Sequence, residues 1–249
     1  MTGTGGRRRR GCTGGVPHWP VPVHHPGVSL PAPVPSPARD RRRPVFSRLY
    51  ARISEGMDAE GLGELRSELL APLSGRVVEV GCGNGRNFAR YPSAVTGVTA
   101  VEPEPHLRGL ASRAAAGAPV PVTVVPGTAE ALPLPDAAFD AAVLCLVLCS
   151  LPDRAGGLAE LGRVLRPGGT LVFLEHGLAP TRRLRAVQRV ADATVWPLLA
   201  GGCHTAVDPV GLVEQAGFEV TALRRLRFPD SRVPLPAAPH VLGAARRPA

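Results

Sequence analysis

The sequence contains no lysine and few aromatic residues. All 29 of its basic residues are arginine, and Phe, Trp and Tyr together make up 4% of the 249 residues. This uniform usage, together with 28 Pro and 29 Gly, indicates GC-rich coding, so the choice of arginine over lysine carries no functional argument. Hydrophobic residues reach 44%, which is ordinary for a globular protein, and Ala, Val and Leu are therefore expected to fill the core.

Long apolar runs and paired cysteines are also missing. No stretch approaches the roughly 18 apolar residues of a membrane span, and no apolar segment follows the first arginines as it would in a secretory signal. The five cysteines, at positions 12, 82, 145, 149 and 203, include no Cys-x-x-Cys pair. We therefore expect no disulfide framework, no metal site and no membrane span, and a reducing, cytoplasmic location.

The net charge of +9 is unevenly distributed along the chain. Residues 1–44 hold eight Arg and one acidic residue, whereas residues 45–249 hold 21 Arg and 19 acidic residues. We predict a disordered Pro/Arg-rich tail over residues 1–44 and one folded domain over residues 45–249. Because the folded part is nearly neutral, nucleic acid is not expected as a partner, and a small molecule is the expected substrate.

Short apolar strands alternate with helical segments over most of the folded part. The expected strands are residues 76–80, 98–101, 120–125, 140–146, 170–174, 220–227 and 240–245. The expected helices are residues 46–53, 62–70, 87–91, 106–115, 156–165, 182–199 and 209–216. Apolar strands separated by helices predict an α/β fold with a seven-stranded, mostly parallel sheet and helices on both faces. The last two strands leave no room for a crossover helix, which predicts a terminal antiparallel strand.

The most informative segment joins the first strand to three glycines at alternate positions. Gly81, Gly83 and Gly85 follow directly on the buried strand, and glycine permits a tight turn and the close approach of a ligand. In α/β sheets such a ligand lies beyond the carboxyl ends of the strands. Glu102 comes 21 residues after Gly81, at the end of the second strand, where a carboxylate can accept hydrogen bonds from a ribose diol.

The spacing of this loop distinguishes between nucleotides. A dinucleotide fingerprint is G-x-G-x-x-G, whereas this loop is G-x-G-x-G with Glu79 two residues before it. A carboxylate beside the loop repels a pyrophosphate but suits a ligand that carries ammonium and sulfonium groups. The loop therefore favours S-adenosylmethionine as cofactor and disfavours NAD and a nicotinamide-dependent oxidoreductase.

Five motifs in order resemble those of a known enzyme family. They are E-V-G-C-G-N-G, V-E-P-E-P, G-T-A-E-A-L-P, F-D-A-A-V and R-V-L-R-P-G-G-T-L, between about residues 75 and 174. As a set they resemble the class I S-adenosylmethionine-dependent methyltransferases of the quinone-biosynthesis-like group, which have a Rossmann-like fold. A closer resemblance, to the methyltransferase-like family whose animal members methylate alkyl thiols, is carried by Leu146–Ser150, Phe173–His176, Gly202-Cys203, Asn87-Phe88 and Tyr91-Pro92.

The resemblance implies roles for particular residues. Glu79, Gly81, Gly83 and Gly85 would line the methionine end and ribose of the cofactor, and Glu102 would hold the ribose hydroxyls. Pro103, Ala129 and Glu130 would border the adenine, and Leu146 would lie beneath the sulfonium. The implied activity is methyl transfer to a small, apolar acceptor such as an alkyl thiol.

Two histidines are candidates for assisting deprotonation of the acceptor. His176 follows the fifth strand and His204 follows Gly201-Gly202-Cys203, and a histidine titrates in the useful range. A thiol, with a pKa near 8.5, needs little assistance, whereas an alcohol or a carbon acid needs more. Cys82, Cys145 and Cys149 are predicted to be core residues.

Several alternatives remain open at this point. The acceptor is alternatively a quinone-like or other aromatic small molecule, methylated on carbon or oxygen. The protein is also compatible with a non-catalytic module that binds S-adenosylmethionine. The arginine-rich amphipathic segment 182–199 is either a lid over the acceptor pocket or a helix that contacts an anionic membrane surface, and we favour the lid.

Overall fold

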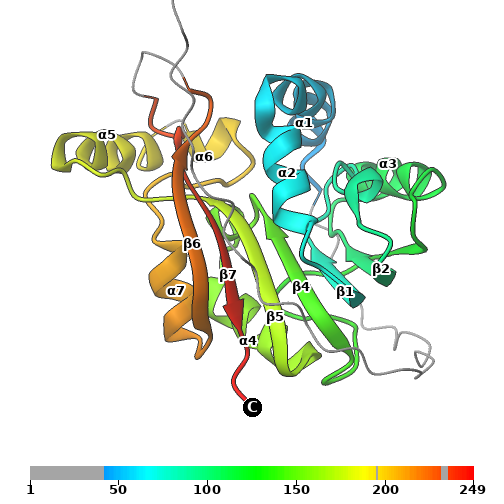
Figure 1. Ribbon diagram of the computed structural model, residues 1–249. Coiled ribbons are helices and arrows are strands. Elements are labelled where there is room, and N and C mark those ends of the chain that lie inside the picture. Colours follow the sequence, from blue (N-terminus) through cyan, green and yellow to red (C-terminus); the bar gives the residue numbers. More distant parts are fainter. Residues whose placement is uncertain (1–41, 195, 231–234) are drawn as a thin grey trace, which may run out of the picture.

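The computed structural model describes residues 42–194, 196–230 and 235–249. Its centre is one seven-stranded sheet in the order β3-β2-β1-β4-β5-β7-β6 (Figure 1). The strands are β1 Gly75–Val80, β2 Val95–Val101, β3 Val122–Val125, β4 Phe139–Cys145, β5 Leu165–His176, β6 Glu219–Arg227 and β7 Pro239–Arg246. All seven expected strands are present, and the α/β fold class is confirmed. The predicted tail of residues 1–44 lies, apart from its last three residues, outside the described part.

Strands β1 to β5 pair in parallel, and their order reverses beside β1. β7 lies between β5 and β6 and is antiparallel to both, which confirms the predicted antiparallel end of the sheet. The reversal of strand order beside β1 matters for function, because α/β proteins bind ligands in the crevice that opens at such a point.

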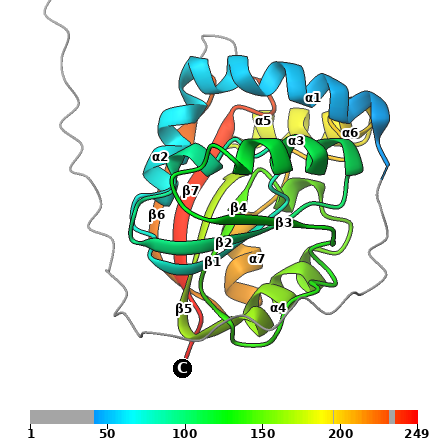
Figure 2. The same ribbon diagram turned by 90° about the vertical axis from the view of Figure 1, so that its right-hand side faces the viewer.

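Helices cover both faces of the sheet (Figure 2). The helices are α1 Pro44–Met57, α2 Gly63–Leu70, α3 Pro105–Ala115, α4 Arg154–Val164, α5 Arg182–Asp192, α6 Trp196–Leu199 and α7 Pro209–Gln215. Helices α2 and α3 pack on one face, and α4 and α7 pack on the other. Among the described residues, no helix has both the length and the apolar character needed to cross a membrane.

Adjacent strand residues divide between two hydrophobic cores because side chains alternate along a strand. Val77 and Val172 belong to the core under α2, whereas Val78 and Leu171 belong to the core under α4 and α7. Apolar side chains of the central strands are therefore buried on both faces of the sheet. This explains why the central strands read as continuous apolar runs and not as alternating patterns.

Two local expectations were wrong. Residues 87–91 do not open a helix, because only a short 3-10 turn, Phe88–Arg90, follows the glycine loop. Segment 182–199 is not one helix, since α5 ends at Asp192 and a separate short helix, α6, begins at Trp196. Helices α1, α5 and α6 lie beyond the carboxyl ends of the parallel strands, at the end of the sheet where the site described next lies (Figure 1).

Candidate active site

A cavity of about 150 Å³ opens where β1, β2 and β4 end. Its wall contains seven of the nine residues expected to hold the cofactor: Gly81, Gly83, Glu102, Pro103, Ala129, Glu130 and Leu146. Further lining residues come from α1 and from the loops after β4 and α6. Among the residues of the wall, three are acidic (Glu102, Glu104 and Glu130) and one is basic (Arg43), so the cavity favours a positively charged ligand.

The glycine loop forms the floor of this cavity in a conformation that other residues rarely adopt. Gly81 and Gly83 have φ angles of +69° and +57°. A Cβ added at Gly81 would lie 2.7 Å from a methyl carbon of Val147, and one at Gly83 would lie 3.1 Å from the Tyr50 ring. The loop thus requires glycine for both backbone conformation and close packing. Gly85 packs instead against the Phe88 ring and is not part of the cavity wall.

Glu102 links the ends of the first two strands. One carboxylate oxygen accepts a hydrogen bond of 2.8 Å from the Gly83 N–H, and the other accepts one of 2.9 Å from the Glu104 N–H. Burial raises the pKa of Glu102, and these two hydrogen bonds oppose the rise. The carboxylate is therefore fixed in position at the cavity wall, with lone pairs left to accept hydrogen bonds from a ligand.

Glu79 lies one layer behind the loop and is not part of the cavity wall. Its carboxylate accepts hydrogen bonds of 2.8 Å from the Asn87 amide and 2.7 Å from the Tyr91 hydroxyl. Burial raises its pKa to about 7. Asn87 also accepts a hydrogen bond from buried Arg66, which pairs with Asp58 at 3.0 Å. Glu79 thus belongs to a buried polar network that supports the loop from beneath.

Leu146 marks the point where β4 ends. It has a φ angle of +61°, which is an outlier for a leucine and costs about 1–3 kcal/mol. Its N–H donates to the Leu174 carbonyl at 2.8 Å, and its side chain lines the cavity. Such strain is typical of functional sites and persists because neighbouring contacts hold it.

Residues of α1 close the cavity from above, and the sequence analysis did not identify them. Phe46 and Tyr50 line the cavity and stack on one another with ring centroids 5.7 Å apart. Phe46 also lies directly against Gly201, in the loop after α6. The one available signal was the helical spacing of these aromatic residues, which indicated a helix but not which surface that helix covers.

The two histidine candidates lie in different surroundings. His176, at the end of β5, has its ring Nδ1 3.7 Å from the Cys203 sulfur. His204 borders a separate cavity with Arg154 and Asp192, and its Nδ1 lies 2.9 Å from the Gly202 carbonyl oxygen. Neither histidine is part of the cofactor cavity wall.

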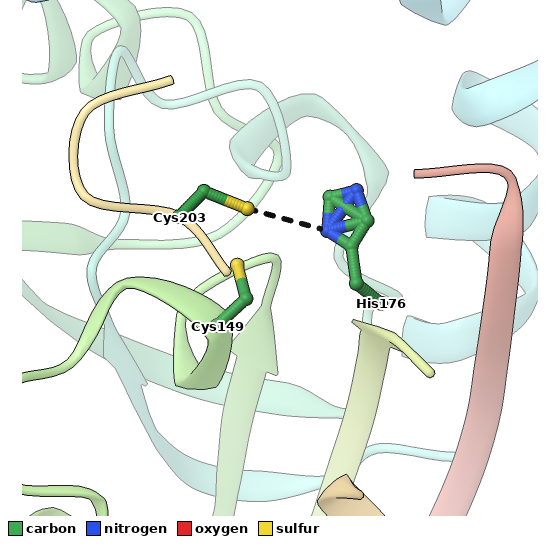
Figure 3. A group of neighbouring side chains, drawn as sticks. All are labelled: Cys149, His176 and Cys203. Atoms are coloured by element: carbon green, nitrogen blue, oxygen red, sulfur yellow. Dashed lines mark hydrogen bonds between the residues drawn. The ribbon is translucent and has the colours of Figure 1, made fainter. Parts of the chain in front are cut away.

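His176 belongs to a compact group of three side chains with Cys149 and Cys203 (Figure 3). One nitrogen and the two sulfurs all lie within 4.8 Å of one another. The residues come from the end of β5, the turn after β4 and the loop after α6, so their positions in the sequence gave no sign of this grouping. Ser150, whose hydroxyl lies 3.5 Å from the Cys149 sulfur, connects the group to the cavity wall.

The two cysteines of this group differ in the pKa of their thiols. A hydrogen bond from Cys149, followed by one from His176, lowers the pKa of the Cys203 thiol to about 5. The hydrogen bond between Cys149 and Cys203 also holds the pKa of the Cys149 thiol well above its usual range. Burial lowers the pKa of His176, but the contact with Cys203 outweighs burial and raises it. These contacts favour ionisation of Cys203 over ionisation of Cys149.

Glu175 precedes His176 and is fully buried. One carboxylate oxygen accepts hydrogen bonds from the N–H groups of Val147 and Leu148, at 2.8 and 3.1 Å. Its other oxygen accepts none from the part of the chain that the structure describes. Burial raises its pKa to about 7. Glu175 thereby positions the turn that carries Cys149.

Comparison with known proteins agrees with the geometry of this site. A family model described as a methyltransferase domain matches residues 78–173. Human thiol S-methyltransferase TMT1B is 33% identical over 190 residues, which cover 73% of this chain and 76% of the relative. Demethylmenaquinone methyltransferase from Thermus thermophilus is 30% identical and covers 64% of this chain and 73% of the relative.

The fold also recurs among solved structures. A SAM-dependent methyltransferase from Thermotoga maritima, described as a possible histamine N-methyltransferase, superimposes with a TM-score of 0.61 at 24% identity. The alignment covers 82% of this chain and 98% of that one.

The fold, the glycine loop and these relatives define an enzyme of the S-adenosylmethionine-dependent methyltransferase class. Within that class, the chain belongs to the methyltransferase family that includes the thiol S-methyltransferases. The family and the fold imply binding of S-adenosylmethionine, and the side-chain-free floor and acidic wall of the cavity suit that cation.

Proposed function

We propose that this enzyme transfers a methyl group from S-adenosylmethionine to the sulfur of a small, apolar alkyl thiol. The observation that carries the proposal is the 33% identity to human thiol S-methyltransferase TMT1B over three quarters of both chains. The mouse protein of the same name supports it, with 35% identity over 81% of this chain. When bound, S-adenosylmethionine supplies a methyl group already activated by its sulfonium, so the protein's task is to align the acceptor and exclude water.

The cofactor residues follow from the cavity wall. Glu102 holds the ribose hydroxyls, because its fixed carboxylate retains free lone pairs. Gly81 and Gly83 admit the methionine end, and Leu146 lies beneath the sulfonium. Pro103, Ala129 and Glu130 border the adenine. Glu79 and Gly85 act indirectly, since they support the loop from outside the cavity.

The acceptor side is formed by the group around His176. A thiol is partly ionised near neutral pH, so a nearby imidazole or a local positive charge gives sufficient assistance. His176 lies at the cofactor end of the sheet and next to the turn that lines the cavity, so it is the better of the two histidine candidates. His204 faces a different cavity and is not assigned a role in the reaction.

The acceptor is tested by offering the full chain a panel of alkyl thiols, phenols and quinones with methyl-labelled S-adenosylmethionine. We expect labelled methyl thioethers from the thiols, identified by mass spectrometry. Turnover of a phenol or quinone without turnover of any thiol would contradict the proposal and favour the second candidate, a C- or O-methyltransferase. The observation that favours this second candidate is the 30% identity to demethylmenaquinone methyltransferase.

The cofactor site is tested by calorimetric titration with S-adenosylhomocysteine. Glu102→Ala removes the charged carboxylate that accepts two hydrogen bonds from the ribose hydroxyls. The affinity of this variant for S-adenosylhomocysteine should therefore fall by about a hundredfold or more, at 1.5–3 kcal/mol per bond. Glu219→Ala, at an exposed position of β6, is the matched control and should bind normally. Equal affinity of Glu102→Ala and the parent, or binding of NADH in place of S-adenosylhomocysteine, would refute the assignment.

A further inference from the structure

Three potential metal ligands converge beside the cofactor cavity. The Cys149 sulfur, the Cys203 sulfur and one ring nitrogen of His176 lie within 4.8 Å of one another, and both cysteines are at most 6% exposed. The side chains point toward a common centre from three separate segments of the chain (Figure 3). Within the described residues, this is the one group of three or more His, Cys, Asp or Glu side chains so arranged.

The distances fit a tetrahedral zinc site. Zn–S bonds of about 2.3 Å and Zn–N bonds of about 2.0–2.1 Å place neighbouring ligand atoms about 3.8 Å apart for two sulfurs and about 3.6 Å for sulfur and nitrogen. The observed separation of the Cys203 sulfur and His176 Nδ1 is 3.7 Å. Binding of a cation would thus need only small side-chain adjustments.

The ligand types also select the metal. Two thiolates and one imidazole suit zinc and disfavour magnesium and calcium, which prefer oxygen ligands. Two thiolates neutralise the charge of Zn²⁺, so the filled site would carry no net charge in its buried surroundings. Three protein ligands with a fourth position open is the arrangement of catalytic zinc sites, whereas structural sites have four protein ligands.

We propose that Cys149, His176 and Cys203 bind one zinc ion, and that the fourth coordination position takes the thiolate of the acceptor. The second half of this statement rests on the proposed function. The acceptor thiol loses its proton to solvent as its sulfur bonds to the metal, and no oxidation or reduction takes place. Ser150, which lines the cofactor cavity, contacts Cys149, so the group lies next to that cavity.

The other interpretation of the group is a set of packed thiols that holds the loop after α6 against the turn after β4. His204 N–H already donates to the Cys149 carbonyl at 2.8 Å, so the two segments are joined without any cation. The two interpretations differ in metal binding, which can be measured without cofactor and without turnover.

The first experiment uses Co²⁺ as a spectroscopic substitute for zinc. The tag-free full chain is reduced with a phosphine, freed of metal by a chelator and titrated with Co²⁺. We expect one ion per chain, with the visible bands of tetrahedral cobalt and the near-ultraviolet charge-transfer band of thiolate ligands, and displacement by Zn²⁺. A titration without the thiolate band would overturn the metal site.

Variants then locate the site. Cys203→Ser and His176→Gln should each weaken cobalt binding by roughly a hundredfold or more, beyond the ten- to hundredfold typical of changes to outer-shell partners. Cys145→Ser is the matched control, because Cys145 is a buried free cysteine that contacts Arg66 and lies outside the group. If Cys145→Ser loses the thiolate band and Cys203→Ser keeps it, the assignment is wrong. Circular dichroism verifies folding, and His176, which is partly exposed, supplies the variant that tolerates substitution if Cys203→Ser does not fold.

The fourth position is tested by adding butanethiol to the cobalt-loaded protein. A third sulfur ligand should intensify and shift the charge-transfer band, whereas butanol should leave it unchanged. An unchanged spectrum with butanethiol would overturn the assignment of the fourth position to the acceptor. These readouts are independent of the acceptor panel, so a metal site that persists while only phenols are methylated would refute the proposed function and leave the metal site standing.

Discussion

Two buried glutamates, Glu79 in β1 and Glu175 in β5, occupy equivalent places in their strands but differ in their partners. Each is the last residue but one of its strand, and burial raises the pKa of each to about 7. Both oxygens of Glu79 accept hydrogen bonds from side chains. Glu175 accepts two backbone hydrogen bonds on one oxygen, and its other oxygen has no partner within the described residues.

The difference separates the two halves of the site. The partners of Glu79 lie 8 and 12 residues further along the chain, so Glu79 and its two partners belong to the segment that carries the cofactor loop. The partners of Glu175 lie 27 and 28 residues before it, on a neighbouring strand end. Both oxygens of Glu79 are thus hydrogen-bonded from within the segment that carries the cofactor loop, whereas Glu175 holds a turn from a distant segment and retains an unpartnered buried oxygen within the described residues. A buried polar atom without a hydrogen-bond partner is costly and calls for an explanation, of which a catalytic role is one.

The largest effect is expected from breaking the support of Glu79. Asn87→Ala removes the amide that joins Glu79 to Arg66, and it leaves both buried groups with one partner fewer. We expect the free energy of unfolding to fall by about 3–5 kcal/mol, measured by chemical denaturation. Asn84→Ala is the control, since Asn84 donates one hydrogen bond to a neutral serine and should cost about 1 kcal/mol. Equal losses would show that the network does not support the loop.

The second prediction concerns the pH dependence of stability that Glu79 and Glu175 cause. A carboxyl group whose pKa is about 7 in the folded state and 4.5 when unfolded stabilises the fold below pH 4.5, and this stabilisation is lost as the pH rises through 7. At pH 8 each glutamate therefore lowers the free energy of unfolding by about 3 kcal/mol, compared with its contribution below pH 4.5. As the pH rises from 4.5 to 8, the free energy of unfolding of Glu79→Gln and that of Glu175→Gln should each increase by about 3 kcal/mol relative to that of the parent.

The measurement is denaturation of parent and variants at both pH values without ligand. The contribution of His240, whose pKa burial lowers to about 3, is present in parent and variants alike and cancels. Glu219→Gln, at an exposed position of β6, is the matched control. A parent-to-variant difference that is constant with pH would mean that neither carboxyl is protonated in the folded protein near neutrality.

The smallest effect is expected at Leu146, where the two halves meet. Leu146→Gly relieves the left-handed backbone conformation but removes a partly buried side chain, so the free energy of unfolding should change by no more than about 1 kcal/mol. Leu144→Ala, two residues earlier in a fully buried position, should cost about 2–5 kcal/mol. A loss at Leu146 as large as that at Leu144 would show that the conformation of Leu146 is not strained.

The same contrast between nearby and distant partners in the sequence explains which features could be predicted from the sequence. The strands were predictable because both sheet faces are buried, and the cofactor loop was predictable because its glycines and Glu102 lie on successive strand ends. The family, the enzyme class and the fold were accordingly confirmed by the comparisons and the sheet. The sequence analysis placed Glu79 against the cofactor, whereas its side chain lies behind the glycine loop. The direction of that side chain depends on Asn87 and Tyr91, whose contacts with Glu79 arise only on folding.

The group around His176 was not predictable in the same way. Cys149, His176 and Cys203 have no diagnostic spacing, and the absence of Cys-x-x-Cys pairs led to the expectation of no metal site. Their meeting depends on three tertiary contacts between strand ends and the loop after α6. The covering of the cavity by Phe46 and Tyr50 likewise depends on where α1 docks, which helical periodicity does not specify.

The position of β7 inside the sheet has a consequence during synthesis. β6 has no other neighbour in the sheet, and the outer edge of β5 stays open until β7 is added. Residues up to His240 must therefore leave the ribosomal exit tunnel before the edge beside His176 is covered. Because β1 to β5 precede β7 in the chain, the nucleoside-binding half can assemble while the edge of β5 beside His176 is still uncovered.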